Sequence, residues 1–243
     1  MAYPIDKKYY INRQPELLKQ FEQEMKYWSP FVFSRYGEIQ GYKILAQTRQ
    51  EFEILIPKIP YIGGDENAFT KNFVESVMYL ALYQAMQAAG FAVEETGRIL
   101  YEAGLVKYRR PAVTPPKTNL IPKQVTERRL NTAALSQERR YPADYVFTFV
   151  PGTSKTFDYG FDFTECATQK LYKAHGAEEL LPYYCYLDFV SAKVRGVKFT
   201  RTQNLYAGQT KCNHRFKTNG VTKAPGPPPF LKRKKKWPRL MSL

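Results

Sequence analysis

Apolar residues recur at helical spacing through the first half of the chain. Stretches in which positions i, i+3, i+4 and i+7 are apolar predict amphipathic helices. The predicted helices cover residues 15–28, 35–56, 68–89 and 93–106. Between residues 108 and 122 the pattern gives way to a stretch with four prolines, which predicts a connecting segment. The N-terminal half is therefore predicted to be helical.

The pattern changes to alternation in the C-terminal half, which is typical of strands. The predicted strands cover residues 145–150, 157–163, 197–206 and 211–217, and the predicted helices residues 165–174 and 182–194. Strand pairs that flank helices indicate an α+β fold. We expect a helical N-terminal half packed on an antiparallel sheet, with further helices in the C-terminal half.

Composition separates a globular part from a tail. The 19 Tyr and 16 Phe of the chain favour a globular core, which we expect as one domain over residues 1–217, helical over 1–110 and sheet-containing over 140–217. Residues 218–243 are rich in proline and carry seven Lys or Arg and no acid, so +8 of the net charge of +15 remains on the domain. Such a tail is expected to be mobile. It could contact an anionic partner, but nucleic-acid binding is not expected without a basic motif with interleaved aromatics.

Cysteine content and hydropathy bear on the compartment. Three cysteines are an odd number and too few for a disulfide scaffold. The most apolar run, residues 73–93, is interrupted by polar residues and predicts a buried helix rather than a membrane span. The first ten residues do not resemble a leader. We therefore expect a cytoplasmic protein without membrane contact.

Cys166 lies in a segment whose pattern bears on its reactivity. It follows the aromatic strand 157–163 and is expected in the first turn of a helix capped by Thr164. The unsatisfied backbone N–H groups of the helix end would stabilise the thiolate there and so lower the pKa of the thiol, which makes it more reactive. Cys166 is therefore the preferred nucleophile. The alternative is that the free cysteines are simply small buried hydrophobes.

Cys185 and Cys212 each share a face with a titratable residue. Cys185 lies three residues before Asp188 on a predicted helix, and Cys212 lies two residues before His214 on a predicted strand. Strand alternation puts Arg201 on a mostly apolar face, where its charge needs either a bound carboxylate or an internal acid as a partner. We predict that the three cysteines converge on one pocket that Arg201 also lines.

A series of short motifs runs in order from about residue 60 to residue 216. The N-terminal motifs are Pro60-Tyr61-Ile62-Gly63-Gly64, Asn67, Thr70, Leu80-Ala81-Leu82-Tyr83 and Glu94-Glu95-Thr96-Gly97-Arg98. The C-terminal motifs are Phe157-Asp158-Tyr159-Gly160, Thr164-Glu165-Cys166, His175-Gly176-Ala177-Glu178-Glu179-Leu180, Cys185-Tyr186-Leu187-Asp188, Arg201-Thr202 and Cys212-Asn213-His214-Arg215-Phe216. This ordered set resembles the L-2-amino-thiazoline-4-carboxylic acid hydrolase family. The chain departs from the family's Cys-Asp-Phe-Arg-Phe pattern at Asn213 and His214, where a neutral amide replaces an ionised carboxylate.

The resemblance implies a hydrolase of cysteine metabolism that opens a cyclic, amidine-like C–N or C–S bond. Its substrate would be a thiazoline carboxylate and its product a carbamoyl-cysteine. A ring carbon bonded to both N and S is electrophilic, so a thiolate could add to it before the adduct is hydrolysed. Asp188 or His214 could move protons, while Arg201 and Asn67 would hold the small carboxylate substrate. Cys185 and Cys212 complete the candidate catalytic set with Cys166, and no cofactor is expected.

Two other functions fit the same residues. Cys166, Cys185, Cys212 and His214 would make a Cys3His set suited to zinc, although cysteine separations of 19 and 27 residues lack the close pairing of zinc motifs. The chain could instead be a non-catalytic module that binds a small carboxylate, because a shared fold does not guarantee a shared activity. Metal content and turnover of thiazoline carboxylates would distinguish the three functions.

Overall fold

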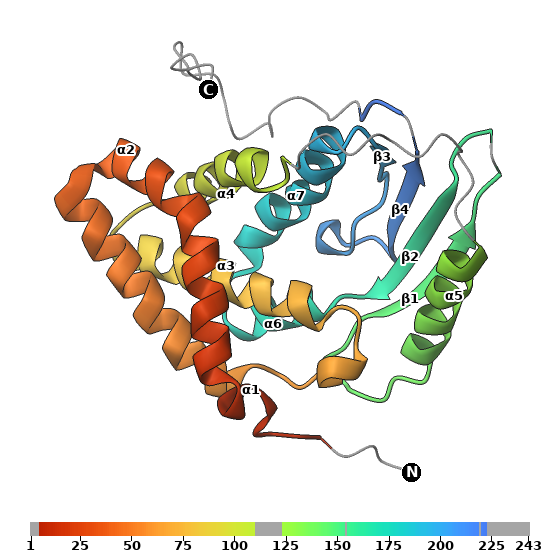
Figure 1. Ribbon diagram of the computed structural model, residues 1–243, viewed down its shortest axis with the longest axis horizontal. Helices are drawn as coiled ribbons and strands as arrows, with labels where there is room; N and C mark the ends of the chain where they lie inside the picture. Colours follow the sequence, from red (N-terminus) through yellow and green to blue (C-terminus); the bar gives the residue numbers. More distant parts are fainter. Residues whose placement is uncertain (1–4, 110–122, 154, 219, 223–243) are drawn as a thin grey trace.

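Helices fill the N-terminal half of the molecule, and a four-stranded sheet lies in its C-terminal half (Figure 1). The computed structural model describes residues 5–109, 123–153, 155–218 and 220–222. Its α-helices are α1 (Tyr9–Asn12), α2 (Gln14–Leu55), α3 (Thr70–Ala88), α4 (Val93–Lys107), α5 (Lys123–Gln137), α6 (Ala167–Ala174) and α7 (Leu181–Val194). Its strands are β1 (Val146–Pro151), β2 (Tyr159–Glu165), β3 (Lys198–Thr200) and β4 (Cys212–Lys217), with short 3-10 turns η1 (Ile56–Lys58), η2 (Gly64–Glu66), η3 (Glu178–Leu180) and η4 (Leu205–Ala207). The predicted α+β fold is confirmed.

One long helix, α2, covers both helices predicted between residues 15 and 56. It bends at Gly37, whose φ of 72° lies in the left-handed region that glycine adopts without steric cost. The rings of Phe33 and Tyr42 meet across the bend with centroids 4.9 Å apart. The two helical arms therefore meet at Gly37, a few residues beyond the predicted gap.

A buried ion pair network ties α2, α3 and α4 together. The Lys107 ammonium lies 2.6 Å from a Glu24 carboxylate oxygen and 2.8 Å from a Glu75 carboxylate oxygen. The Tyr79 hydroxyl lies within hydrogen-bond distance of both carboxylates. Because each charge has a partner, the interior of the helical half can hold these groups among apolar residues.

Close approach of α4 and α7 depends on a glycine. A Cβ atom at Gly97 would lie only 1.8 Å from Cδ1 of Tyr183, so that no other residue fits without displacing the Tyr183 ring. The helix that carries Cys185 and Asp188 is thereby seated against α4.

The strands form an antiparallel sheet in the order β1-β2-β4-β3. In the β2–β4 pair, Phe161 lies opposite His214 and Phe163 opposite Cys212. Aromatic rings cover this face, with Phe147 and Phe163 stacked at 5.0 Å between centroids. This face turns toward the helices, and α7 lies beside β3 (Figure 1).

The pattern along the sequence did not predict α5, which lies beside the edge strand β1 (Figure 1). Its last turn completes the hydrogen bonds of that edge. The Ser136 hydroxyl accepts from the Phe147 N–H (3.1 Å), and the Gln137 amide donates to the Phe147 carbonyl (2.7 Å). Helix α5 therefore protects an edge that would otherwise expose unpaired backbone groups.

Two predictions for the end of the chain need correction, the strand over residues 197–206 and the start of the tail. Strand β3 ends at Thr200, so the prediction of a strand over 197–206 is wrong beyond that residue. Most of the predicted tail, residues 223–243, and most of the predicted connector lie outside the described residues. The first tail residues belong to the fold, since the buried Thr222 hydroxyl accepts from the Phe199 N–H (2.9 Å) and Thr218 donates through N–H and hydroxyl to Asp158 (2.6 and 2.7 Å).

Candidate active site

Cys166 lies at the junction of β2 and α6. It is the N-cap residue of α6, with an extended backbone, while Thr164 lies within β2 and donates its hydroxyl to the Val146 carbonyl (3.3 Å). Burial raises the pKa of the Cys166 thiol to about 11, although the backbone N–H groups of Gln169 and Thr168 act to lower it. Two predictions are therefore wrong. Cys166 rather than Thr164 is the N-cap residue of α6, and the pKa of the Cys166 thiol is raised rather than lowered.

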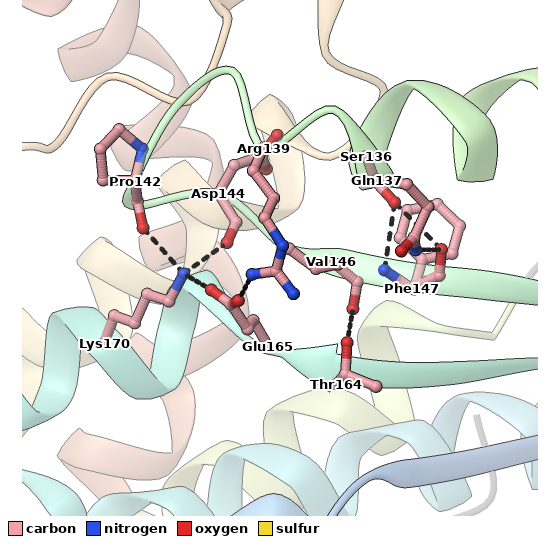
Figure 2. A network of polar contacts seen from close by, with 10 residues as sticks. All are labelled: Ser136, Gln137, Arg139, Pro142, Asp144, Val146, Phe147, Thr164, Glu165 and Lys170. Atoms are coloured by element: carbon pink, nitrogen blue, oxygen red, sulfur yellow. Dashed lines mark hydrogen bonds and ion pairs between the residues drawn. The ribbon is translucent and has the colours of Figure 1, made fainter.

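Charged contacts hold the start of α6 against the loop that precedes β1 (Figure 2). Glu165, the last residue of β2, pairs with both Arg139 and Lys170. Lys170 also donates to the carbonyls of Pro142 (2.8 Å) and Asp144 (3.0 Å). Because all three donors of the ammonium are used, Lys170 positions the helix start rather than acting on a substrate.

A buried arginine joins α7 to the sheet. The Arg201 side chain is only 3% exposed, and it donates to the Asp188 carboxylate (2.8 Å) and to the Cys185 carbonyl (2.8 Å). Its Nη1 lies 3.5 Å from Nε2 of His214. Of the two predicted partners for this charge, the structure contains the internal acid. The Nε–H of Arg201 is buried and has no acceptor among the described residues.

Cys212 and His214 project from one face of β4, as predicted. The Leu205 N–H donates to the Cys212 sulfur (3.2 Å). The His214 ring lies between those of Phe163 and Phe199, with centroids 5.2 and 5.3 Å away. Burial lowers the pKa of His214 to about 4, so its imidazole is neutral at pH 7.

The three free thiols lie close enough to affect one another's ionisation. Burial raises the pKa of each, and the Cys212 thiol adds to this effect at Cys166. The Cys166 and Cys212 thiols add to it at Cys185. Asp188 also raises the pKa of each thiol, whereas Arg201 lowers that of Cys185 and Cys212. The structure therefore brings the three cysteines together around Arg201 and Asp188.

Sequence reasoning missed three tyrosines that surround the thiols. Burial, and then the nearby Cys166 and Cys185 thiols, raise the pKa of Tyr145 and Tyr172. Tyr206, in η4, is affected in the same way by burial and then by Cys185. Aromatic residues in buried helices and strands have the pattern of ordinary core residues, so no signal in the sequence distinguished these three.

Asn67 lies between η2 and α3. Its carboxamide donates to the Ile62 carbonyl and to Asp144 (2.8 Å), and its oxygen accepts from the Phe69 N–H (2.9 Å). It lines two hollows with volumes of about 100 and 430 Å³, and no cysteine lines either of them. These hydrogen bonds do not join Asn67 to the cysteines, Arg201 or Asp188, but Tyr145, which lies beside the thiols, lines the smaller hollow with it. A role for Asn67 in substrate binding stays a prediction.

Two further properties concern the described part of the chain alone. No group of three or more His, Cys, Asp or Glu side chains there is arranged to hold a metal ion, so the Cys3His alternative gains no support from the geometry. Within the same residues, no helix has the length and apolar character needed to cross a bilayer.

Comparison with known proteins gives one match. A family model described as L-2-amino-thiazoline-4-carboxylic acid hydrolase matches residues 71–216, which include the three cysteines, Asp188 and Arg201. No curated protein and no solved structure matches the chain significantly. The matched segment is more than half of the 243 residues and runs from the first turn of α3 to β4. The chain belongs to the L-2-amino-thiazoline-4-carboxylic acid hydrolase family.

Proposed function

We propose that this protein is a hydrolase that opens a small cyclic amidine carboxylate, of the thiazoline carboxylate type, at a ring C–N or C–S bond. Membership of the family supports hydrolysis. The observation that carries the proposal is a set of three free thiols that affect one another's pKa, together with Arg201, a buried cation whose Nε–H has no acceptor among the described residues. This arrangement joins nucleophiles to a group that binds carboxylates.

Cys166 is the proposed nucleophile. Its thiol is neutral at rest, so it must lose its proton when the substrate binds. The N–H groups at the start of α6 already favour the thiolate, and a cationic amidine ring beside the sulfur would favour it further. The thiolate adds to the ring carbon between N and S, one ring bond breaks, and the departing atom takes a proton. Water then attacks the same carbon and releases Cys166 and a carbamoyl product.

Asp188 is the better candidate for exchanging protons with water. Its side chain is 45% exposed, although it is paired with Arg201. His214 is enclosed by aromatic rings, and with a pKa of about 4 it is a weak base. Cys185 and Cys212, neutral because burial raises their pKa, would donate a proton to the departing atom.

The substrate carboxylate would bind the Nε–H of Arg201, which has no acceptor in the described part of the chain, since the two terminal nitrogens already donate to Asp188 and the Cys185 carbonyl. Asn67 is left out of the proposed site because its amide atoms are used in the loop around it. These residues supply a nucleophile, a proton carrier and a carboxylate ligand, so we propose that the reaction needs no cofactor. Three free thiols also suit a reducing compartment, and we propose the cytoplasm.

Turnover of 2-amino-thiazoline-4-carboxylate by the purified protein tests the proposal. Loss of the ring is followed by NMR for the wild type, Cys166→Ser and Cys166→Ala, with and without a chelator. We expect turnover by the wild type that the chelator does not affect, and none by either variant at an unchanged melting temperature. Chelator-sensitive turnover would favour the zinc alternative, and binding without turnover by the wild type would favour a non-catalytic module.

A further inference from the structure

One short segment after β3 carries three buried polar atoms that have no hydrogen-bond partner in the part of the chain that the structure describes. Among the described residues, nine buried side-chain nitrogen and oxygen atoms have no hydrogen bond, and three of these belong to residues 201–204. They are Nε of Arg201, Oε1 of Gln203 and Oδ1 of Asn204. Folded proteins leave few such atoms unpaired because each costs about 1–3 kcal/mol. Three of them on one short segment, the loop of residues 201–206, need a specific explanation.

This loop lies against the cysteine cluster. Arg201 donates to the Cys185 carbonyl at one end of the loop. Near its other end, the Leu205 N–H donates to the Cys212 sulfur. Tyr206 lies near enough to the Cys185 and Cys212 thiols for them to affect its hydroxyl. Gln203 and Asn204 therefore lie between two groups that contact the proposed reaction site.

Hydrogen bonds to the side chains of Asn213 and Gln209 fix the backbone of this loop, so its unpaired atoms are not explained by a poorly ordered backbone. The Asn213 carboxamide oxygen accepts from the N–H groups of Thr202 (2.8 Å) and Gln203 (2.7 Å). The Asn213 amide donates to the Thr202 hydroxyl (2.8 Å), and the Gln209 side chain accepts from the Asn204 N–H (2.6 Å). Asn213, one of the two residues at which the chain departs from the family pattern, thus positions this loop.

The unpaired atoms have complementary chemistry. Arg201 offers a charged donor, which suits a carboxylate, and the two carboxamides offer acceptors, which suit N–H groups. We propose that the loop of residues 201–206 recognises the substrate, and that Gln203 and Asn204 accept hydrogen bonds from the nitrogen-bearing end of the ring whose carboxylate is held by Arg201. This inference rests on the proposed function and adds to it the residues that select an amino-substituted ring. Asn213 is a positioning residue.

Binding of two ligands tests the inference separately from turnover. The ligands are 2-amino-thiazoline-4-carboxylate and thiazoline-4-carboxylate, which lacks the amino group. Their affinities are measured by calorimetry in a Cys166→Ala background, which removes the proposed nucleophile. Without further changes, we expect the amino ligand to bind at least about tenfold more tightly. Gln203→Leu and Asn204→Leu should each weaken the amino ligand by about 10- to 100-fold, the range for a lost hydrogen bond to a charged group. They should change the affinity of the other ligand by less than about threefold.

Two further variants separate recognition from folding. Gln203→Glu keeps an acceptor and should retain the preference for the amino ligand. Thr200→Val changes an exposed residue of β3 just before the loop and should leave the preference intact. The inference is overturned if the parent shows no preference, or if the Leu variants weaken both ligands equally. If the Leu variants lose the preference and the wild type does not turn the ligand over, the recognition role of the loop is supported and the proposed hydrolase activity is rejected. If the wild type turns the ligand over and the Leu variants keep the preference, the activity is supported and the recognition role of the loop is rejected.

Discussion

The pH dependence of Cys166 alkylation is the sharpest consequence of the site's burial. With a pKa of about 11 instead of 9.0, the thiolate fraction at pH 8 falls from roughly one in ten to about one in a thousand. Because the thiolate is the species that reacts, alkylation should be about 100-fold slower than for an ordinary cysteine. This expectation reverses the prediction, made from the position of Cys166 near a helix end, that its thiol is activated at rest.

The assay is alkylation of the wild-type protein with isotope-coded iodoacetamide from pH 7 to pH 10, read for each cysteine by peptide mass spectrometry. The same protein unfolded in guanidinium chloride provides the reference rate for each peptide. In the folded protein the rate at Cys166 should rise about tenfold per pH unit without a plateau. Restricted access alone would lower the rate but would not remove the plateau, so the shape of the curve identifies the cause. A rate that levels off between pH 9 and pH 10, or a folded rate equal to the unfolded rate, would refute the reasoning.

Three further results follow from contacts in the fold. The buried imidazole of His214 stays neutral in the folded protein down to about pH 4, whereas in the unfolded chain it is protonated below about pH 6.5. Protonation therefore favours the unfolded state, and the free energy of unfolding should fall by about 3 kcal/mol as the pH drops from 6.5 to 4. His214→Asn should remove this part of the loss in guanidinium titrations at each pH, and an identical pH dependence in both proteins would contradict it. Gly97→Ala should cost about 1–3 kcal/mol, seen as a lower melting temperature, because the new methyl group collides with Tyr183; an unchanged melting temperature would show that the Tyr183 ring moves aside without cost. Thr222→Val should cost about 1–3 kcal/mol by leaving a buried N–H unpaired, whereas deletion of residues 223–243 should leave the melting temperature and turnover unchanged, and a loss of several degrees on deletion would show that the tail packs.

Periodicity predicted the elements whose residues bury one face, and it failed where contacts distant in sequence decide the structure. The ranges of α3, α4 and α7 agree with the predictions to within about two residues. Helix α5 has few apolar residues, and its hydrogen bonds to β1 could not be foreseen from its own sequence. Strand β3 stops early because the Asn213 side chain, rather than a neighbouring strand, accepts from the N–H groups that follow.

The composition of the site could also be predicted only in part. Residues that share a face of one element, such as Cys212 and His214, follow from spacing alone. The pKa of Cys166 does not follow from spacing, because it depends on how deeply the folded chain buries the thiol. The motif that contains Asn67 marks a loop whose amide contacts are internal, and spacing does not distinguish such a loop from a substrate contact.

Trapping of a covalent intermediate tests the central claim, nucleophilic catalysis by Cys166, most directly. The protein is mixed with 2-amino-thiazoline-4-carboxylate, quenched in acid during turnover and digested, and each cysteine peptide is weighed. We predict a mass increase from the opened ring on the peptide that contains Cys166, and on neither of the peptides that contain Cys185 and Cys212. Turnover without an adduct on Cys166, by a protein whose Cys166→Ser variant is fully active, would contradict the account.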